Sequence, residues 1–210
     1  MKKLPVIKPT LILLCSLLFL AGCSEADVPK EGDKYVTIPT PITDSDMGEV
    51  TEVFSLVCGH CRKMEQQIPA IEAITKVKTD KVHVVFNESA QLAAIIYYTA
   101  AIQSDGGVPD EALMSELFSA VQDSDAFMTK AFQPVLEQIF SSRGLVSPYK
   151  LDEQQRERVF SKLQFSETLT EQSGLQSVPA FIVKGTYLVQ SSNHKDIEDI
   201  ANTINYLRSK

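Results

Sequence analysis

The sequence predicts an α/β fold in which a small sheet is interrupted by a long helical insertion. Three observations lead to this prediction. Between residues 50 and 86 a strand, a helix and a second strand follow one another, which is the order of a right-handed βαβ unit with parallel strands. Helical periodicity then continues as far as Val178. The remaining residues return to two short strands and an amphipathic helix.

The first strands are expected where short apolar or β-branched runs lie between turn signals. A strand over 35–38 is closed by Pro39 and Pro41, because proline cannot donate to a sheet ladder. The apolar run over 50–57 is predicted to be a buried strand. The β-branched run over 82–86 is predicted to be its parallel neighbour.

The helices are expected from apolar residues at helical spacing. The first opens directly after the buried strand, and Pro69 is expected to kink it. In the insertion, Pro134 is expected to break a helical stretch and Gly144 to end it. Asp152 and Gln155 are expected to form the capping box of the next helix. The apolar stripes of the insertion, interpreted as core, fall within residues 92–102, 113–121 and 128–140.

The last part of the chain is expected to form a hairpin and a closing helix. Residues 179–183 and 187–189 alternate as strands, with Gly185 in the turn between them. Apolar residues between Ile197 and Leu207 then recur at helical spacing.

Composition indicates one well-packed domain with an acidic surface. The chain has 210 residues, of which 44% are hydrophobic and 22% charged, values typical of an ordinary globular domain. Its formal net charge of −7 disfavours nucleic acid as a partner, since that affinity depends largely on lysine and arginine neutralising phosphates. We expect a monomer that binds no nucleic acid.

The N-terminus is predicted to be an export leader. Lys2 and Lys3 precede an apolar run over 11–20, which is too short to span a membrane as a helix. The run ends in Leu-Ala-Gly-Cys at Cys23, which resembles the lipobox of bacterial lipoproteins. We therefore expect Cys23 to be lipidated and the protein to be anchored on the extracytoplasmic, periplasmic side of a bacterial membrane. A plain secretory signal or an uncleaved anchor remains the alternative.

These features give a predicted domain organisation. Residues 1–22 are the lipoprotein signal peptide, and the polar, acidic residues 23–34 are a flexible tether. The α/β domain comprises 35–89 and 176–210, and the helical insertion comprises 90–175.

Only one pair of cysteines remains once Cys15 leaves with the leader and Cys23 is lipidated. Cys58 and Cys61 stand at the predicted start of a helix, where free N–H groups and the helix dipole favour a thiolate at the first position. The spacing predicts Cys58 as the exposed nucleophile and Cys61 as the partner that resolves a mixed disulfide. His60, between them, is expected to lower the pKa of Cys58 by charge or by a hydrogen bond.

Other uses of two cysteines at this spacing are less compatible with the sequence. Haem attachment needs a histidine directly after the second cysteine, and Arg62 stands there. Zinc would need two more ligands, and His83 and His194 lack the usual paired spacing, although zinc stays as a minor alternative. We expect no metal and no cofactor beyond the redox-active Cys58–Cys61 pair, and assign neither distant histidine a role.

The residues around the cysteines resemble the DsbA family of oxidoreductases. The segment Glu52-Val-Phe-Ser-Leu-Val-Cys-Gly-His-Cys61 is similar to that family's strand, active site and helix start. Ser177-Val-Pro-Ala-Phe-Ile-Val183, followed by Gly185 and Tyr187, is similar to its cis-proline loop and hairpin. The resemblance extends over about 35–210 and implies a thioredoxin fold with a helical domain inserted between the third strand and the cis-proline strand.

The resemblance also implies roles for individual residues. Pro179 is expected to be cis and to pack beside the dithiol, and Val178 to contact the substrate backbone. Glu52 is expected to lie beneath the active site and to assist proton transfer, with a solvated strand carboxylate as the equal alternative. The implied activity is disulfide formation in unfolded or reduced exported proteins, with re-oxidation by a DsbB-like membrane protein.

One departure from the family affects the direction of electron flow. The dipeptide between the cysteines is Gly59-His60, whereas the family usually has Pro-His. A disulfide isomerase or reductase of the same compartment therefore stays as an alternative function. A non-enzymatic lipoprotein that binds peptides as a chaperone, with a merely structural disulfide, is the second alternative.

Overall fold

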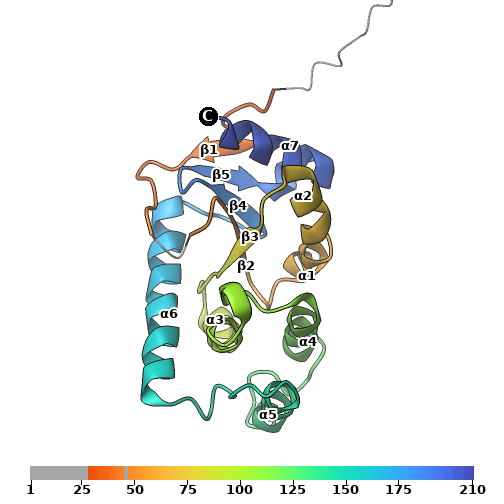
Figure 1. Cartoon of the computed structure of the whole chain (residues 1–210), viewed down its shortest axis with the longest axis vertical. Coiled ribbons are helices and arrows are strands. Elements are labelled where there is room, and N and C mark those ends of the chain that lie inside the picture. The colour runs from red at the N-terminus through yellow and green to blue at the C-terminus, as the bar shows by residue number, and fades with distance from the viewer. Residues whose placement is uncertain (1–27, 45–46) are drawn as a thin grey trace, which may run out of the picture.

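The computed structural model describes residues 28–44 and 47–210, and its strands form one mixed sheet in the order β1-β5-β4-β2-β3 (Figure 1). The strands are β1 (Tyr35–Thr37), β2 (Val50–Phe54), β3 (Thr79–His83), β4 (Ala180–Val183) and β5 (Tyr187–Gln190). β2 and β3 are parallel, whereas β4 runs antiparallel to β2 and β5, and β1 antiparallel to β5. The predicted βαβ unit and hairpin are confirmed. The leader, Cys23 and the first part of the tether lie outside the described residues.

Helices cover both faces of the sheet and form the half of the molecule farthest from β1 (Figure 1). One face packs against α2 and α7, and the other against the end of α6, which runs along the molecule's long axis. Helices α3 to α6 come between β3 and β4 in the chain, as the predicted insertion requires. The helices are α1 (Gly59–Glu65), α2 (Ile68–Thr75), α3 (Glu88–Ala101), α4 (Glu111–Gln122), α5 (Phe132–Ser142), α6 (Glu153–Ser173) and α7 (Ile197–Arg208), with short 3₁₀ turns η1 (Asp105–Gly107) and η2 (Ser191–Asn193).

Strands β2 and β3 end earlier than their sequence pattern predicts. β2 stops at Phe54 because the following residues turn, with the Cys58 N–H donating to Ser55 O at 3.0 Å. β3 lies three residues before the expected run, over Thr79–His83, in register with Val50–Phe54. The start of this strand is not predicted from the sequence, because its first residues are polar and do not form an apolar or β-branched run.

Two prolines start helices where the sequence analysis expected a kink and a break. Pro69 lies in the first turn of the separate helix α2, and Pro134 in the first turn of α5. Those predictions are wrong because a first-turn residue needs no intrahelical donor, which is the one helical place where proline fits well. The helix-end predictions are confirmed: Gly144 has a φ of +71° just after α5, and Asp152 and Gln155 form the capping box of α6.

β3 is an edge strand, and its free side is covered by two tyrosines of α3. The Tyr98 hydroxyl accepts from the His83 N–H at 2.9 Å, and the Tyr97 hydroxyl donates to Lys81 O at 3.4 Å. Tyr98 also bonds Ser166 of α6. The inserted helices thus satisfy backbone groups that no further strand pairs.

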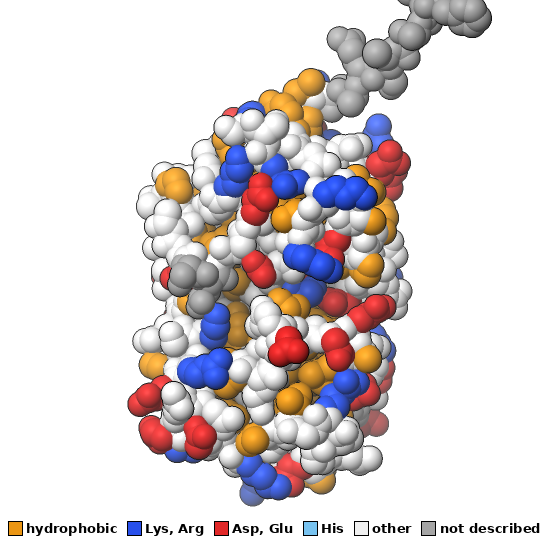
Figure 2. All heavy atoms as spheres, in the orientation of Figure 1, with side chains coloured by type: hydrophobic (Ala, Val, Ile, Leu, Met, Phe, Trp, Pro, Cys, Tyr) orange, Lys and Arg blue, Asp and Glu red, His pale blue; other side chains and the backbone are white. Residues whose placement is uncertain are grey.

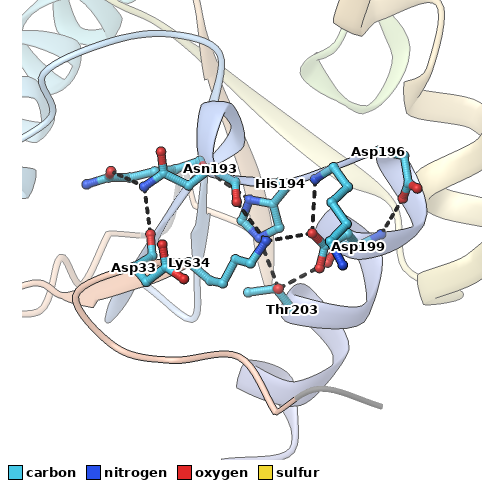
Figure 3. A network of polar contacts seen from close by, with 9 residues as sticks. Asp33, Lys34, Asn193, His194, Asp196, Asp199 and Thr203 are labelled. Carbon is cyan, nitrogen blue, oxygen red and sulfur yellow. Dashed lines mark hydrogen bonds and ion pairs between the residues drawn. The ribbon is translucent and has the colours of Figure 1, made fainter. Parts of the chain in front are cut away.

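At the opposite edge, a polar network joins β1 to α7 and η2 (Figure 3). Lys34 Nζ lies 2.6 Å from Asp199 Oδ2 and 2.7 Å from Asn193 O. His194 extends the network through Thr203 Oγ1, 3.0 Å from its Nε2. These contacts fix the beginning of the described domain to its last helix.

Acidic and basic side chains are interspersed on the face shown in Figure 2. Within residues 28–44 and 47–210, no helix combines the length and apolar character that crossing a membrane requires.

We predict that Gly185→Ala destabilises the protein far more than Gly144→Ala. Both glycines have positive φ, +61° and +71°, but a Cβ at Gly185 would lie 2.0 Å from the carbonyl oxygen of Ile42 whereas one at Gly144 meets nothing. We expect a loss of about 1–2 kcal/mol for Gly144→Ala and of more than about 3 kcal/mol for Gly185→Ala. Guanidinium unfolding measures both, and equal losses would contradict the steric argument.

Candidate active site

The predicted dithiol stands where β2 meets α1. Cys58 is the N-cap residue, with φ −94° and ψ 114°, and its Sγ accepts from the Cys61 N–H at 3.2 Å. Both cysteines are free thiols in the structure; Cys58 is half-buried and Cys61 is buried. The geometry places a partly accessible sulfur in front of a protected one.

The two thiols differ sharply in acidity. The pKa of Cys58 is lowered to about 6, chiefly because the Cys61 side chain donates a hydrogen bond to its sulfur. The backbone N–H groups of Cys61 and His60 lower it further, while burial opposes them. Burial raises the pKa of Cys61 well above its usual range, and the nearby Cys58 and Glu52 charges add to this effect. At neutral pH Cys58 is a thiolate and Cys61 a thiol.

His60 acts on Cys58 through its backbone N–H and its charge. Its side chain is exposed, and no hydrogen bond joins it to the Cys58 sulfur. Of the two effects expected for the His60 side chain, the electrostatic one is therefore supported, and it lowers the Cys58 pKa less than the hydrogen bonds from Cys61 and from the His60 backbone do.

The loop before β4 completes the mouth of the site. The Val178–Pro179 peptide bond is cis, as the family resemblance implied. Val178 O lies 3.5 Å from Cys58 Sγ, although the two residues are 120 positions apart in the chain. The structure therefore brings together the four predicted residues Cys58, Cys61, Val178 and Pro179.

Glu52 lies buried beneath the dithiol, so the interpretation as a solvated carboxylate is wrong. Its Oε2 is bonded to Lys81 Nζ, which also lies 2.7 Å from Glu65 Oε2. Its Oε1 has no hydrogen-bond partner among the described residues. Burial raises the Glu52 pKa despite the adjacent ammonium group, because a buried carboxylate loses its hydration. No sequence pattern singles out Lys81 or Glu65, because each stands beside a polar residue in the chain, as an exposed residue would.

His83, for which the sequence predicts no role, supports the active-site turn from below. The ring is fully buried; Nε2 accepts from the Leu56 N–H at 2.8 Å, and Nδ1 lies 2.7 Å from Val84 O. Both contacts suit a neutral ring that carries its proton on Nδ1. Burial lowers the His83 pKa to about 3, so the ring stays neutral at physiological pH. His194 lies in the network between β5 and α7, outside the site.

The inserted helix α4 holds the active-site turn from the other side. The side-chain amide of Gln122 donates to Leu56 O at 2.7 Å and to Cys58 O at 3.1 Å. Arg62 on α1 makes two hydrogen bonds to the carboxylate of Asp123, at 2.7 and 2.8 Å. These partners lie about sixty positions away in the chain, and pattern reasoning could not find them.

A groove of 660 Å³ opens beside the dithiol, between α1 and the cis-proline loop. Its lining residues are His60, Lys63, Met64, Gln66, Gln67, Ser177, Val178, Pro179, Ser191 and Ser192.

In the described parts of the chain, no cluster of three or more histidine, cysteine or acidic side chains has the geometry of a metal site.

We predict that the alkylation rate of Cys58 in the reduced protein rises with pH around a midpoint near 6. Because the folded pKa lies below the unfolded value, the thiolate's contribution to stability is complete above about pH 9 and is lost as the pH falls through about 6. Cys61→Ala removes the strongest donor and should raise the midpoint by about one to two units. Iodoacetamide kinetics measure the midpoint; no change in the variant would show that the Cys61 side chain is not responsible.

Comparison with known proteins agrees with this geometry. A thioredoxin family model matches residues 47–205. DsbA from Pseudomonas aeruginosa superposes with a TM-score of 0.70 at 19% identity, covering 88% of this chain and 95% of that one. DsbA from Xylella fastidiosa gives 0.69 at 22% identity, covering 87% and 97%.

A complex of Proteus mirabilis DsbA with the non-covalently bound peptide PWATCDS gives a TM-score of 0.60 at 16% identity, covering 87% of this chain and 99% of that one. No curated protein sequence matches the chain. The likeness to these structures shows a shared fold, including the inserted helices. With the family match over most of its length, this chain belongs to the thioredoxin family and has the fold of DsbA.

Proposed function

We propose that this protein is a thiol-disulfide oxidoreductase that introduces disulfides into exported proteins. The observation that carries the proposal is the asymmetry of the dithiol: Cys58 is half-exposed with a pKa of about 6, and Cys61 is buried with a raised pKa. A structural disulfide needs no such asymmetry. The Proteus mirabilis protein of this fold binds a peptide, which supports a polypeptide chain as the substrate, and the groove beside Cys58 is the place where we propose that this chain lies.

The reaction transfers two electrons from a substrate dithiol to the oxidised Cys58–Cys61 pair. A substrate thiolate attacks Cys58 Sγ and forms a mixed disulfide, while the Cys61 sulfur leaves and takes up a proton. A second substrate thiolate attacks the substrate sulfur of that mixed disulfide. The substrate disulfide forms, and Cys58 leaves as the thiolate. Its low pKa makes it a good leaving group and stabilises the reduced enzyme, which favours oxidation of the substrate.

Glu52 is proposed to exchange the proton of Cys61. It is the buried carboxyl group closest in the chain to the dithiol, its charge acts on the Cys61 pKa, and its Oε1 has no hydrogen-bond partner in the described part of the chain. Burial raises the pKa of Glu52, which makes it easier for this carboxyl group to hold a proton and then pass it on.

The compartment and the partners follow from the leader rather than from the fold. The lipobox-like sequence at Cys23 supports a lipid anchor on the periplasmic side of a membrane, and the net charge of −7 supports protein rather than nucleic-acid partners. A DsbB-like membrane protein would return the reduced dithiol to the disulfide, and lipid tethering would keep the two close. We propose that the protein acts as a monomer and needs no cofactor beyond this disulfide.

A disulfide isomerase or reductase is the second candidate function, because Gly59 stands where the DsbA family usually has proline. The residue is exposed, and a Cβ there would meet nothing within 4 Å, so the dipeptide can vary without disturbing the fold. The reduction potential against a glutathione buffer separates the candidates. A potential as low as that of thioredoxin, about −270 mV, would overturn the oxidase assignment.

We predict that Cys58→Ser abolishes disulfide formation in a reduced, unfolded substrate protein, because the attacked sulfur is gone. Regain of substrate activity under a glutathione redox buffer measures this. Arg143→Gln, far from the dithiol, is the matched control and should retain the wild-type rate. Undiminished activity in Cys58→Ser would leave only a peptide-binding chaperone role.

We also predict that Glu52→Gln slows turnover at pH 7 by about ten-fold or more, since the amide cannot exchange a proton with Cys61. Glu65→Gln is the control, because it loses a bond to the same lysine but leaves Glu52 in place. The pH dependence of the rate and the free energy of unfolding should be measured for both. If the two variants had equal rates and equal stabilities, Glu52 would serve only as an ion-pair partner of Lys81 and not in proton transfer.

A further inference from the structure

Helix α1 presents one side to the groove beside the dithiol. His60, Lys63 and Met64 lie at i, i+3 and i+4, the spacing that places side chains on one face of a helix. The opposite wall is the loop of Val178 and Pro179. The groove therefore has apolar side chains on both walls, Met64 on one and Val178 and Pro179 on the other, with one lysine on its helical side.

The charge of Lys63 is not compensated, unlike those of its neighbours on α1. Arg62 is paired with Asp123, and Glu65 with Lys81. Lys63 is exposed, and no carboxylate of the described residues lies within ion-pair distance of its Nζ. None of the residues lining the groove is acidic. In a chain of net charge −7, this leaves a local positive site next to the nucleophile.

We propose that Lys63 selects substrate segments that carry an acidic side chain about two residues from the reacting cysteine. This inference rests on the proposed function and names its substrate preference. The helix rises about 7.5 Å between residues 58 and 63, and an extended chain covers that length in about two residues. An aspartate or glutamate at that place meets Lys63 when the substrate sulfur meets Cys58, whereas a lysine there is repelled.

The test uses the oxidised protein and reduced peptides with two cysteines that are identical except at one position. Glutamate, glutamine or lysine is placed one or two residues before or after the first cysteine. Because a neighbouring charge also changes the peptide's own thiolate fraction, each rate is divided by the rate of the same peptide with a small aromatic disulfide. We expect the glutamate peptide to exceed the lysine peptide by about two- to five-fold at the best position.

Variants of the lysine then identify the source of the preference. In Lys63→Gln, the ratio of the oxidation rate of the glutamate peptide to that of the lysine peptide should fall to about one. In Lys63→Glu, it should fall below one. Lys76→Gln, which also removes an exposed positive charge, at the end of α2, should leave it unchanged. A ratio that persists in Lys63→Gln overturns the inference.

The glutamine peptide distinguishes the two proposals. Its oxidation at equal rates by the wild-type protein and by Lys63→Gln would uphold the oxidoreductase function whatever the charged peptides show. Oxidation of none of the peptides would remove that function and the inference with it.

Discussion

The hydrogen bonds from Cys61 to the Cys58 sulfur are the interaction on which the rest of the site depends. They exist only while Cys58 is the N-cap of α1 and Cys61 lies one turn deeper, so the start of this helix has to be held closely. His83 fixes the turn through the Leu56 N–H, and Gln122 fixes it through the Leu56 and Cys58 carbonyls. One support comes from the sheet and the other from the inserted helices, so the redox chemistry depends on both halves of the fold.

Charge buried beneath the dithiol is the second constraint. A carboxylate and an ammonium group lose much hydration inside a protein, and their attraction offsets this loss only with good geometry. The arrangement of Glu52, Lys81 and Glu65 supplies that geometry, yet among the residues that the structure describes one oxygen of Glu52 has no partner. Burying this oxygen without a hydrogen bond costs free energy of desolvation, which a purely structural ion pair would avoid. The arrangement agrees with the proposal that Glu52 exchanges protons.

Most of the fold and the centre of the site could be predicted from patterns of residues that lie close together in the sequence. The Cys58 and Cys61 pair, the capping box at Asp152 and the hairpin around Gly185 each depend on residues a few positions apart. β3 was misplaced because its polar Lys81 is acceptable in a core only through Glu52, a partner on another strand. Gln122 and His83 were missed for the same reason. Their roles exist only after folding has brought distant segments together, and no local spacing encodes them.

The tyrosine cover of β3 has a consequence for the proposed function, in which the substrates are unfolded chains. Such chains present extended segments that pair with any strand whose backbone groups are open, and an uncovered edge would recruit them into mixed sheets. With Tyr97 and Tyr98 bonded to the strand's outer backbone groups, that edge offers an incoming chain few free partners. For the unfolded substrates that we propose, this cover would keep extended polypeptide from pairing with the edge of the sheet and leave the groove beside the dithiol as its place of contact.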